Sequence, residues 1–464
     1  MINQKAEAFF QKIKGKRVAF CGIGRSNLPL IRLFHQKGAV CIACDRRTEA
    51  QLGQIVEELR TMGVSLKTGE TYLDHLDVDI LFRTPGMKYH LPALNAARAQ
   101  GIAVTSEMEV FFQLCPCKIY GVTGSDGKTT TTTILSEFLK EAGKTVHLGG
   151  NIGKPLLPEI ESIGPDDVAV VELSSFQLIS MRQSPDVAIV TNLSPNHLDI
   201  HRDMDEYIGA KKNILLHQTA FSRTVLNQDN ALTMEFAPDV RGQLLTFSRR
   251  LPCKNGAYLR DGKIIFAENG HESVLMDQSQ IRIPGMHNVE NYLAAISAVW
   301  GVVPPEAIVA VAQRFGGVAH RAELVRTFHG VTYYNDSIGT SPTRTIKGTL
   351  SLYKQKIILI AGGYDKNLSY DELGEILPEK VKALILMGAT ADKIENATRA
   401  SSQYQPGKPE IYRVSSMEEA VQKASEIAQE GDIVSMSPAS ASFDLYPNFE
   451  ARGDHFKAVV NALQ

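Results

Sequence analysis

Short apolar runs recur along this 464-residue chain, and most are separated by segments whose apolar positions have helical spacing. The runs lie at residues 17–21, 39–45, 79–83, 118–122, 167–171, 187–190, 331–334, 356–360, 383–387 and 433–436. A strand that is apolar on both faces is typical of a parallel sheet covered by helices on both sides. The pattern therefore predicts an α/β protein built from parallel sheets.

The runs fall into three groups, which we interpret as three domains. A Rossmann-like first domain is expected over residues 1–106, and a central domain over residues 107–317. The central domain adds a small β meander, because Asp261-Gly262 and Asn269-Gly270 are hairpin signals between apolar runs. Gly316-Gly317 indicates a domain boundary. A third, Rossmann-like parallel-sheet domain is expected after it, over residues 318–464.

The composition is that of an ordinary soluble globular protein. Hydrophobic residues make up 44% and charged residues 22% of the chain, and the net charge is −2. This charge gives no attraction to nucleic acid or to an anionic membrane. No apolar run is long enough for a membrane span or a signal peptide, so we expect a cytoplasmic protein.

The six cysteines are scattered along the chain. Cys41 and Cys44 have the spacing of a redox or zinc pair but no matching second pair, which favours buried reduced thiols.

One stretch carries a specific chemical signal. The apolar run 118–122 leads into a glycine-bearing turn, residues 124–127, and then into a helical segment. A strand, such a turn and a helix N-terminus form a cradle of backbone N–H groups for phosphate. Lys128 would add a charge at the terminal phosphates, and Thr129 a hydroxyl for Mg²⁺. The strict P-loop pattern is missed, because Val122 stands where its first glycine belongs. We still expect a P-loop ATPase-type sheet, with ATP bound by Gly124, Ser125, Asp126, Gly127, Lys128, Thr129 and Thr130.

Polar residues follow the next strands of the central domain. Glu172 ends one apolar run, which is the usual place for an acid that holds Mg²⁺ beside a P-loop. His197 follows another run, so a ligand role is favoured over a packing role. Lys211 and Lys212 lie in a helical segment, where a solvated pair is the ordinary interpretation. Asn288 and Asn291 share one helix face, and their spacing leaves a structural role open.

The first domain begins with half of a dinucleotide-binding unit. Gly22 and Gly24 follow the first strand, and Asp45 lies about 20 residues further on, where a ribose-binding acid would be. Asn27 occupies the place of the third glycine, which makes an ordinary NAD site doubtful. Arg46 and Arg47 follow Asp45 and could meet phosphates or solvent. Thr84 comes at the end of another strand, an edge where ligands of open α/β sheets bind.

Four strands of the third domain end in polar residues: 335–337, 362–366, 388–390 and 437–442. Because parallel strands end at one edge of a sheet, these groups predict a binding face.

The assembly resembles the Mur ligase family over essentially its full length, and in particular the family's D-glutamate-adding members. The most specific segments are residues 123–129, 172–177, 287–291, 320–321, 335–337 and 437–449. The resemblance implies a ligase that uses ATP to add D-glutamate to UDP-N-acetylmuramoyl-L-alanine, a step of peptidoglycan precursor synthesis. The first domain would then bind the UDP end of the substrate, which accounts for its broken dinucleotide pattern. A monomer with small-molecule substrates and no nucleic-acid or membrane partner is expected.

The resemblance also implies a role for each matching residue. Catalytic residues would be Lys128, Glu172, His197 and Lys211. Two Mg²⁺ ions would be held by Thr129, Glu172, His197 and Lys211, the last carbamylated by CO₂. ATP would also contact Asn288, Asn291, Arg321 and Asp336. The UDP-substrate would contact Asn27, Asp45, Arg46, Arg47, Thr84, Asn151, Ser174 and Gln177. D-glutamate would contact Thr340, Lys366, Ser442 and Phe449.

One position departs from the family pattern. Many members have a lysine after Asn335-Asp336-Ser337, whereas this chain has Ile338. The departure puts one cationic contact in doubt, and the reaction class is unaffected.

Two alternative functions are a folylpolyglutamate synthase and a P-loop switch that binds nucleotide without ligating. The UDP-type first domain argues against the synthase. A related amidotransferase subunit with a four-cysteine zinc ribbon is disfavoured, because the central domain has three cysteines: 115, 117 and 253.

Overall fold

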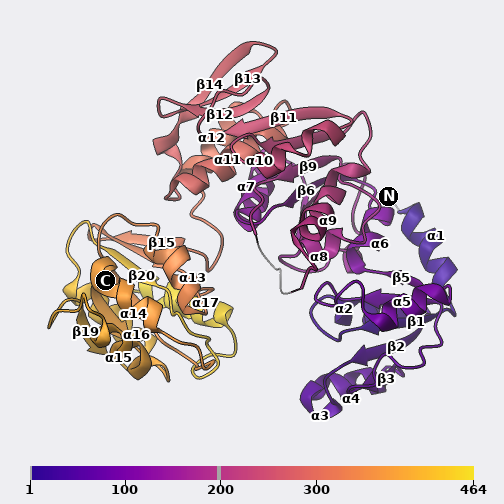
Figure 1. Cartoon of the computed structure of the whole chain (residues 1–464), viewed down its shortest axis with the longest axis horizontal. Coiled ribbons are helices and arrows are strands. Elements are labelled where there is room, and N and C mark those ends of the chain that lie inside the picture. The colour runs from indigo at the N-terminus through magenta and orange to yellow at the C-terminus, as the bar shows by residue number, and fades with distance from the viewer. Residues whose placement is uncertain (1–2, 196–199) are drawn as a thin grey trace. The chain divides into compact units, whose positions relative to one another are not determined.

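The computed structural model describes residues 3–195 and 200–464 (Figure 1). Its contacts divide the chain into two compact units. The first unit contains Met1–Gln280 and His287–Gln313, and the second contains Ile281–Met286 and Arg314–Gln464. Two sheets lie in the first unit and one in the second. Most neighbouring strands in all three sheets pair in parallel, as the apolar runs predicted.

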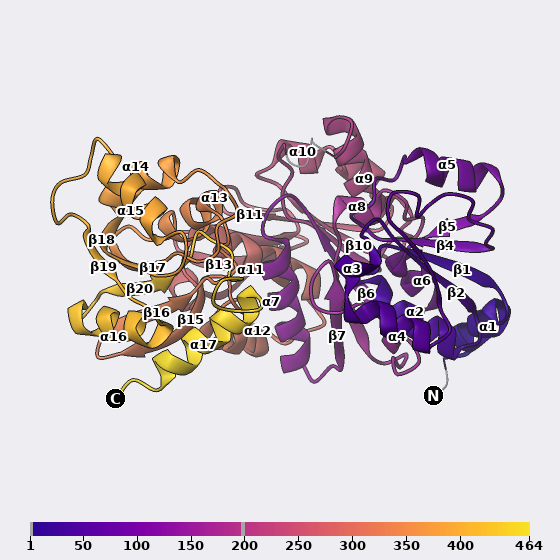
Figure 2. The same cartoon turned by 90° about the horizontal axis from the view of Figure 1, so that it is seen from below.

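The N-terminal sheet is fully parallel and has the strand order β3-β2-β1-β4-β5. Its strands are β1 (Arg17–Cys21), β2 (Val40–Asp45), β3 (Ser65–Thr68), β4 (Ile80–Arg83) and β5 (Ala103–Thr105). Its helices are α1 (Gln4–Ile13), α2 (Asn27–Gln36), α3 (Glu49–Leu52), α4 (Gln54–Thr61) and α5 (Pro92–Ala99). Figure 2 shows α5 on one face of this sheet and α1, α2 and α4 on the other. Side chains alternate accordingly, since Ala19 packs with Leu94 of α5 while Phe20 packs with Phe34 of α2.

The central sheet has nine strands in the order β14-β13-β12-β11-β10-β9-β6-β8-β7. They are β6 (Lys118–Thr123), β7 (Val146–Gly150), β8 (Val168–Glu172), β9 (Val187–Val190), β10 (Arg223–Asn227), β11 (Gln243–Ser248), β12 (Gly256–Arg260), β13 (Lys263–Glu268) and β14 (His271–Asp277). The helical segments are α6 (Glu107–Leu114), α7 (Lys128–Glu141), η1 (Leu157–Glu159), α8 (Ser175–Leu178), α9 (Met204–Leu216), α10 (Ala231–Met234), η2 (Ala237–Asp239), η3 (Gln278–Gln280), α11 (Met286–Val299) and α12 (Pro305–Arg314). The expected meander is β12–β14. It forms the antiparallel edge of this same sheet, joined to it by the parallel pair β11–β12.

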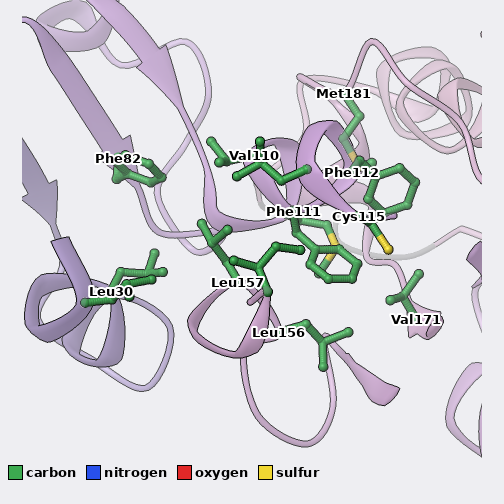
Figure 3. Close-up of a cluster of buried hydrophobic side chains, with 14 of the residues drawn as sticks. Leu30, Phe82, Val110, Phe111, Phe112, Cys115, Leu156, Leu157, Val171 and Met181 are labelled. Atoms are coloured by element: carbon green, nitrogen blue, oxygen red, sulfur yellow. The ribbon is translucent and has the colours of Figure 1, made fainter. Parts of the chain in front are cut away.

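The two sheets of the first unit share one apolar core. Figure 3 shows part of it, with Phe82 of β4, Phe111 of α6, Leu157 of η1 and Val171 of β8. The buried side chain of Asn3 adds polar links, because its amide donates to the carbonyl oxygens of Leu114 (3.0 Å) and Ile160 (3.3 Å). A shared core of this kind favours a fixed arrangement of neighbouring sheets.

The second unit contains a six-stranded sheet with the order β15-β16-β20-β17-β18-β19. Its strands are β15 (Glu323–Phe328), β16 (Val331–Asn335), β17 (Ile357–Ala361), β18 (Val381–Leu386), β19 (Glu410–Arg413) and β20 (Ile433–Met436). Its helices are α13 (Pro342–Thr345), the π-helical turn η4 (Ile346–Leu350), α14 (Asp371–Lys380), α15 (Ala391–Ala400), α16 (Met417–Ile427) and α17 (Phe449–Asn461). Alternate residues of β17 face opposite sides: Ile358 packs in the cluster that contains α16 and α17, and Leu359 in the cluster with α14 and α15. This double covering accounts for the continuous apolar strand sequences.

All six cysteines are buried and unbridged. Burial raises the pKa of Cys41 to about 12 and that of Cys253 to about 11. Among the described residues, no helix combines the length and apolar character that crossing a membrane requires.

Candidate functional site

The glycine-bearing turn lies at the point where the strand order of the central sheet reverses. Strand β6 lies between β9 and β8, so the ends of these three strands meet at one edge. Ligands of open parallel sheets bind at such points. Gly124 has φ +146°, and a Cβ there would lie 1.9 Å from the Thr191 hydroxyl oxygen, so only glycine fits this approach.

Residues after β9 fix the backbone of this turn. The Asn192 side-chain oxygen accepts from Asp126 N–H (2.9 Å), and the Thr191 hydroxyl donates to the Asp126 carbonyl (2.6 Å). The Ser125 hydroxyl lies 2.9 Å from the Tyr207 hydroxyl of α9. Sequence reasoning did not expect Thr191 and Asn192 at this site. Their place at the edge next to β6 was the available signal.

Glu172 is the acidic centre of this edge. Its side chain is buried at the end of β8. One carboxylate oxygen accepts from the Thr129 hydroxyl (2.7 Å) and the other from the Asn151 amide (2.7 Å). Both partners are neutral, and no salt bridge to Glu172 is found among the described residues. The arrangement brings together three residues that the sequence placed in two sites, since Asn151 was expected to contact the UDP-substrate.

Two lysines converge on the same turn. Lys128, the first residue of α7, donates to the carbonyl oxygens of Gly124 (3.1 Å) and Ser125 (3.0 Å). Lys211 of α9 is 2% exposed and donates to the same Gly124 carbonyl (2.7 Å). Burial first, and then the charge of Lys128, hold the pKa of Lys211 well below its usual value.

The neighbouring lysine points to a different environment. Lys212 is only half-buried and forms an ion pair with Asp239. Of the pair that the sequence left open, Lys211 is therefore the one beside the turn.

The side chains of Asn288 and Asn291 in α11 lie beside the start of α7. The Asn291 side-chain oxygen accepts from the Thr131 hydroxyl (3.2 Å), and its amide donates to the Asn288 side-chain oxygen (3.1 Å). Gly127 has φ +76°, and a Cβ there would lie 2.4 Å from the same Asn291 oxygen. Both asparagines are thus adjacent to the expected phosphate cradle. His197, the remaining expected metal ligand, lies outside the described residues.

In the N-terminal sheet, Asp45 organises the loop after β1. Its carboxylate accepts from the N–H of Ile23 (2.7 Å) and binds the Arg47 guanidinium (2.8 Å). The contacts to Arg47 lower the pKa of Asp45 against the opposing effect of burial. Asn27 is buried and donates to the Cys21 carbonyl (3.0 Å), and Arg46 is exposed.

A cavity of about 230 Å³ lies between the two sheets of the first unit. Thr84, Asn151 and Gln177, all expected at the UDP-substrate, line it. Gln177 and Ser174 form a capping box at the start of α8, in which the Gln177 oxygen accepts from Ser174 N–H (2.9 Å). The box fixes the side chain of Gln177 at the cavity wall.

In the second unit, polar residues gather at the carboxyl edge of β16, β20, β17 and β18, as expected. Asp336 is buried, and its carboxylate accepts from the hydroxyls of Thr349 (2.7 Å) and Ser437 (2.8 Å). Burial raises the pKa of Asp336. Arg321 is exposed, and its charge opposes that rise.

The four residues expected at D-glutamate lie around this edge. Ser442 is buried, Thr340 and Phe449 are half-buried, and Lys366 is exposed. Arg452 of α17, which sequence reasoning missed, supports them. Its buried guanidinium donates to the carbonyl oxygens of Ala441 (2.9 Å) and Ser337 (2.9 Å). It also donates to the Ser337 hydroxyl (3.0 Å), and no motif marks this arginine because folding alone brings Ser337 to it.

Comparisons with known proteins cover the whole chain. The model of the Mur ligase middle domain matches residues 122–299, and that of the Mur ligase glutamate ligase domain matches residues 320–440. The chain is 51% identical to the UDP-N-acetylmuramoylalanine–D-glutamate ligase of Acetivibrio thermocellus and 46% identical to that of Ruminiclostridium cellulolyticum; each match covers 100% of both chains. Among solved structures, the UDP-N-acetylmuramate-alanine ligase MurC of Thermotoga maritima superposes with a TM-score of 0.56 at 18% identity, covering 96% of this chain and 99% of that one. At this identity the superposition supports the fold alone.

The contact between Gly127 and Asn291 yields a test of the phosphate cradle. We expect Gly127→Ala to weaken ATP binding by at least about tenfold, because the added Cβ displaces the turn from Asn291, and tenfold is only about 1.4 kcal/mol. Gly143→Ala is the matched control, since Gly143 has φ +78° but an added Cβ would meet nothing within 4 Å. Isothermal titration with ATP measures both. Equal affinities in the two variants would contradict the placement of ATP at this turn.

Proposed function

Because the chain belongs to the Mur ligase family, we propose that it joins D-glutamate to the carboxyl group of UDP-N-acetylmuramoyl-L-alanine with cleavage of ATP to ADP and phosphate, a step of peptidoglycan precursor synthesis. The observation that carries the proposal is the Thr129–Glu172 pair beside Lys128 and Lys211, at the turn after β6. Full-length identity of 51% to a relative named for this reaction supports the choice of amino acid.

The proposed chemistry begins by activating a poor acyl donor. The substrate carboxylate attacks the γ-phosphorus of ATP, the bond to the bridging oxygen breaks, and an acyl phosphate and ADP result. The neutral amine of D-glutamate then attacks the acyl carbon, its nitrogen loses one proton, and phosphate leaves the tetrahedral intermediate as the amide forms. Phosphoryl transfer depends mainly on alignment and on neutralising charge. Lys128 supplies a cation at the turn, and we propose that Arg321 and Asp336 of the second unit also act on ATP.

The residues at the end of β8 suit a hard divalent cation. Mg²⁺ prefers oxygen ligands, and the buried Glu172 carboxylate and the Thr129 hydroxyl provide them. Mg²⁺ bound there would neutralise phosphate charge during transfer. We propose that two ions are held, by Thr129, Glu172, His197 and carbamylated Lys211.

Carbamylation of Lys211 would supply anionic oxygens where an ammonium group would repel a cation. In this reaction the neutral amine forms an N–C bond to CO₂ and releases one proton, which leaves a carbamate. The reaction needs a neutral amine, and burial lowers the pKa of Lys211 in that direction. Lys212 lacks this environment, because it pairs with Asp239.

The UDP-substrate and D-glutamate are assigned to residues outside the phosphate-binding turn. We propose that the UDP-substrate occupies the 230 Å³ cavity, with Thr84, Asn151 and Gln177 on its wall, and that Ser174, which shares the capping box with Gln177, also contacts it. Asn27, Asp45, Arg46 and Arg47 would serve its nucleotide end. D-glutamate would bind at Thr340, Lys366, Ser442 and Phe449. Since ATP and UDP-sugars are cytoplasmic metabolites, we propose that the protein works in the cytoplasm, as a monomer.

The direct test is phosphate release with purified protein, ATP, Mg²⁺, UDP-N-acetylmuramoyl-L-alanine and D-glutamate. We expect release to require both co-substrates and to fall to background when either is omitted. Replacement of the UDP-substrate by folate tests the folylpolyglutamate alternative in the same assay. Phosphate release from ATP alone, unaffected by D-glutamate, would instead identify a nucleotide switch.

The two adjacent lysines provide a matched test of the carbamate. We expect Lys211→Ala to lose most of its activity, and formate to restore part of it by placing carboxylate oxygens in the vacated space. Lys212→Ala should remain close to wild type, because Lys212 lies against Asp239. Initial rates with and without formate measure both effects. Full activity in Lys211→Ala combined with an inactive Lys212→Ala would refute the assignment.

The exposed Lys366 tests the amino-acid site. We expect Lys366→Ala to raise the KM for D-glutamate by roughly tenfold or more, since a charge-assisted hydrogen bond contributes about 1.5–3 kcal/mol. The KM for the UDP-substrate should change far less. Lys354→Ala removes another exposed lysine of the second unit and is the control. Equal changes in both KM values for Lys366→Ala would count against this placement.

A further inference from the structure

A second cavity in the first unit, of about 320 Å³, is not used by the proposed reaction. It lies between the segment that follows β4 and the helical region of α8 and α9. None of its lining residues lines the 230 Å³ cavity. A cavity of this volume is at the lower end of the range that holds small organic ligands.

Arg83 gives this cavity a specific chemical character. The residue is 1% exposed, yet it lines the cavity wall. Its Nη2 donates to the Phe176 carbonyl (2.9 Å) and to the Ser180 hydroxyl (2.7 Å), whereas its buried Nη1 has no hydrogen-bond partner. A buried unpaired donor on a charged group is costly, and an acceptor that enters the cavity would remove this cost.

Among the described residues, Arg83 forms no ion pair with a carboxylate, although its guanidinium carbon lies 5.5 Å from the centroid of the Tyr89 ring. The nearest carboxylate in its hydrogen-bond network is that of Glu109, which accepts from the Ser180 hydroxyl (2.9 Å) rather than from the arginine itself. Burial lowers the pKa of Arg83, and Glu109 opposes that effect. The guanidinium therefore remains an anion-seeking group at the wall of the cavity.

The other charges around the cavity leave a net positive balance. Glu206 is its acidic residue, and its carboxylate is already engaged by Arg202 (2.9 Å), by His90 (3.3 Å) and by His201 (3.4 Å). Lys88 adds an exposed cation on the same wall. An anion in the cavity would thus meet Arg83 and Lys88, while Glu206 is neutralised by its partners.

The rest of the wall is apolar. Phe176 and Ile179 of the α8 region line the cavity together with Leu91 and Met87 of the segment after β4. Tyr89 is held in place by Arg98, whose guanidinium lies 4.1 Å from the ring centroid. Apolar walls with few polar groups are typical of sites that bind an apolar body and orient it by one charged end.

We propose that this cavity binds a small organic anion, with a carboxylate on Arg83 and an apolar or aromatic body between Phe176, Ile179 and Leu91. The site is separate from the proposed substrate cavity and does not depend on the proposed function.

The test uses two probes of nearly equal shape, 3-phenylpropionate and its neutral amide, 3-phenylpropionamide. Ligand-observed NMR titration of the full chain should show at least about tenfold tighter binding of the carboxylate, the effect of one charge-assisted contact. Ile179→Trp, which fills the cavity, should abolish binding, and Arg83→Met should remove the preference for the carboxylate. Arg60→Met, which removes an exposed arginine of α4, is the control and should bind like wild type.

Three results would overturn the proposal. They are failure of wild type to bind the carboxylate, equal binding of the two probes, and unchanged binding in a folded Ile179→Trp variant. Competition with UDP identifies one cause of unchanged binding in Ile179→Trp. If UDP displaces the probe from this variant, the probe is bound in the nucleotide site and not in the proposed cavity. Arg83 also supports α8, so circular dichroism checks that Arg83→Met is folded. If it is not, Ile179→Trp and the comparison of the two probes decide.

Discussion

The first unit depends on a buried carboxylate at the end of one central strand. Glu172 accepts hydrogen bonds from Thr129 at the start of α7 and from Asn151 after β7, so one side chain ties three chain segments together. Both donors are neutral, whereas the charge of the carboxylate acts on Lys211 and raises the pKa of that lysine against the effect of burial. An anionic oxygen is also the kind of ligand that a divalent cation binds. In the proposed metal site, Glu172 is therefore an oxygen ligand whose position is fixed by Thr129 and Asn151 before an ion binds.

Much of the fold could be predicted from the sequence, because its strands are apolar on both faces and short. The polar edge of the third domain was expected from the rule that parallel strands end at one edge, and the ends of β16, β20, β17 and β18 do lie at one edge. The hairpin turn at Asp261-Gly262 was also correct. The meander's continuity with the central sheet was not predictable, because the pairing of β11 with β12 is a contact between strands whose register no local signal fixes.

Site chemistry was less accessible where it rests on backbone contacts. Arg452 and Arg83 are both buried, and both donate to carbonyl oxygens, so their surroundings depend on how distant segments pack. A P-loop lysine can be identified from the motif around it, whereas no motif surrounds these two arginines. Ile338, the departure from the family pattern, has an arginine nearby: Arg344 donates to its carbonyl oxygen (3.1 Å). A cation is thus present close to the position where the resemblance led us to expect a lysine.

The burial of every cysteine has a practical consequence. Thiol reagents attack the thiolate, and a raised pKa with little solvent access suppresses it at Cys41 and Cys253. Because all six thiols are buried, we expect the native protein to react only slowly with maleimide dyes. One new cysteine on an exposed position of each unit would give a doubly labelled protein with the natural thiols left in place. Energy transfer between the dyes would then follow the distance between the two units as nucleotide, sugar substrate and amino acid are added in turn.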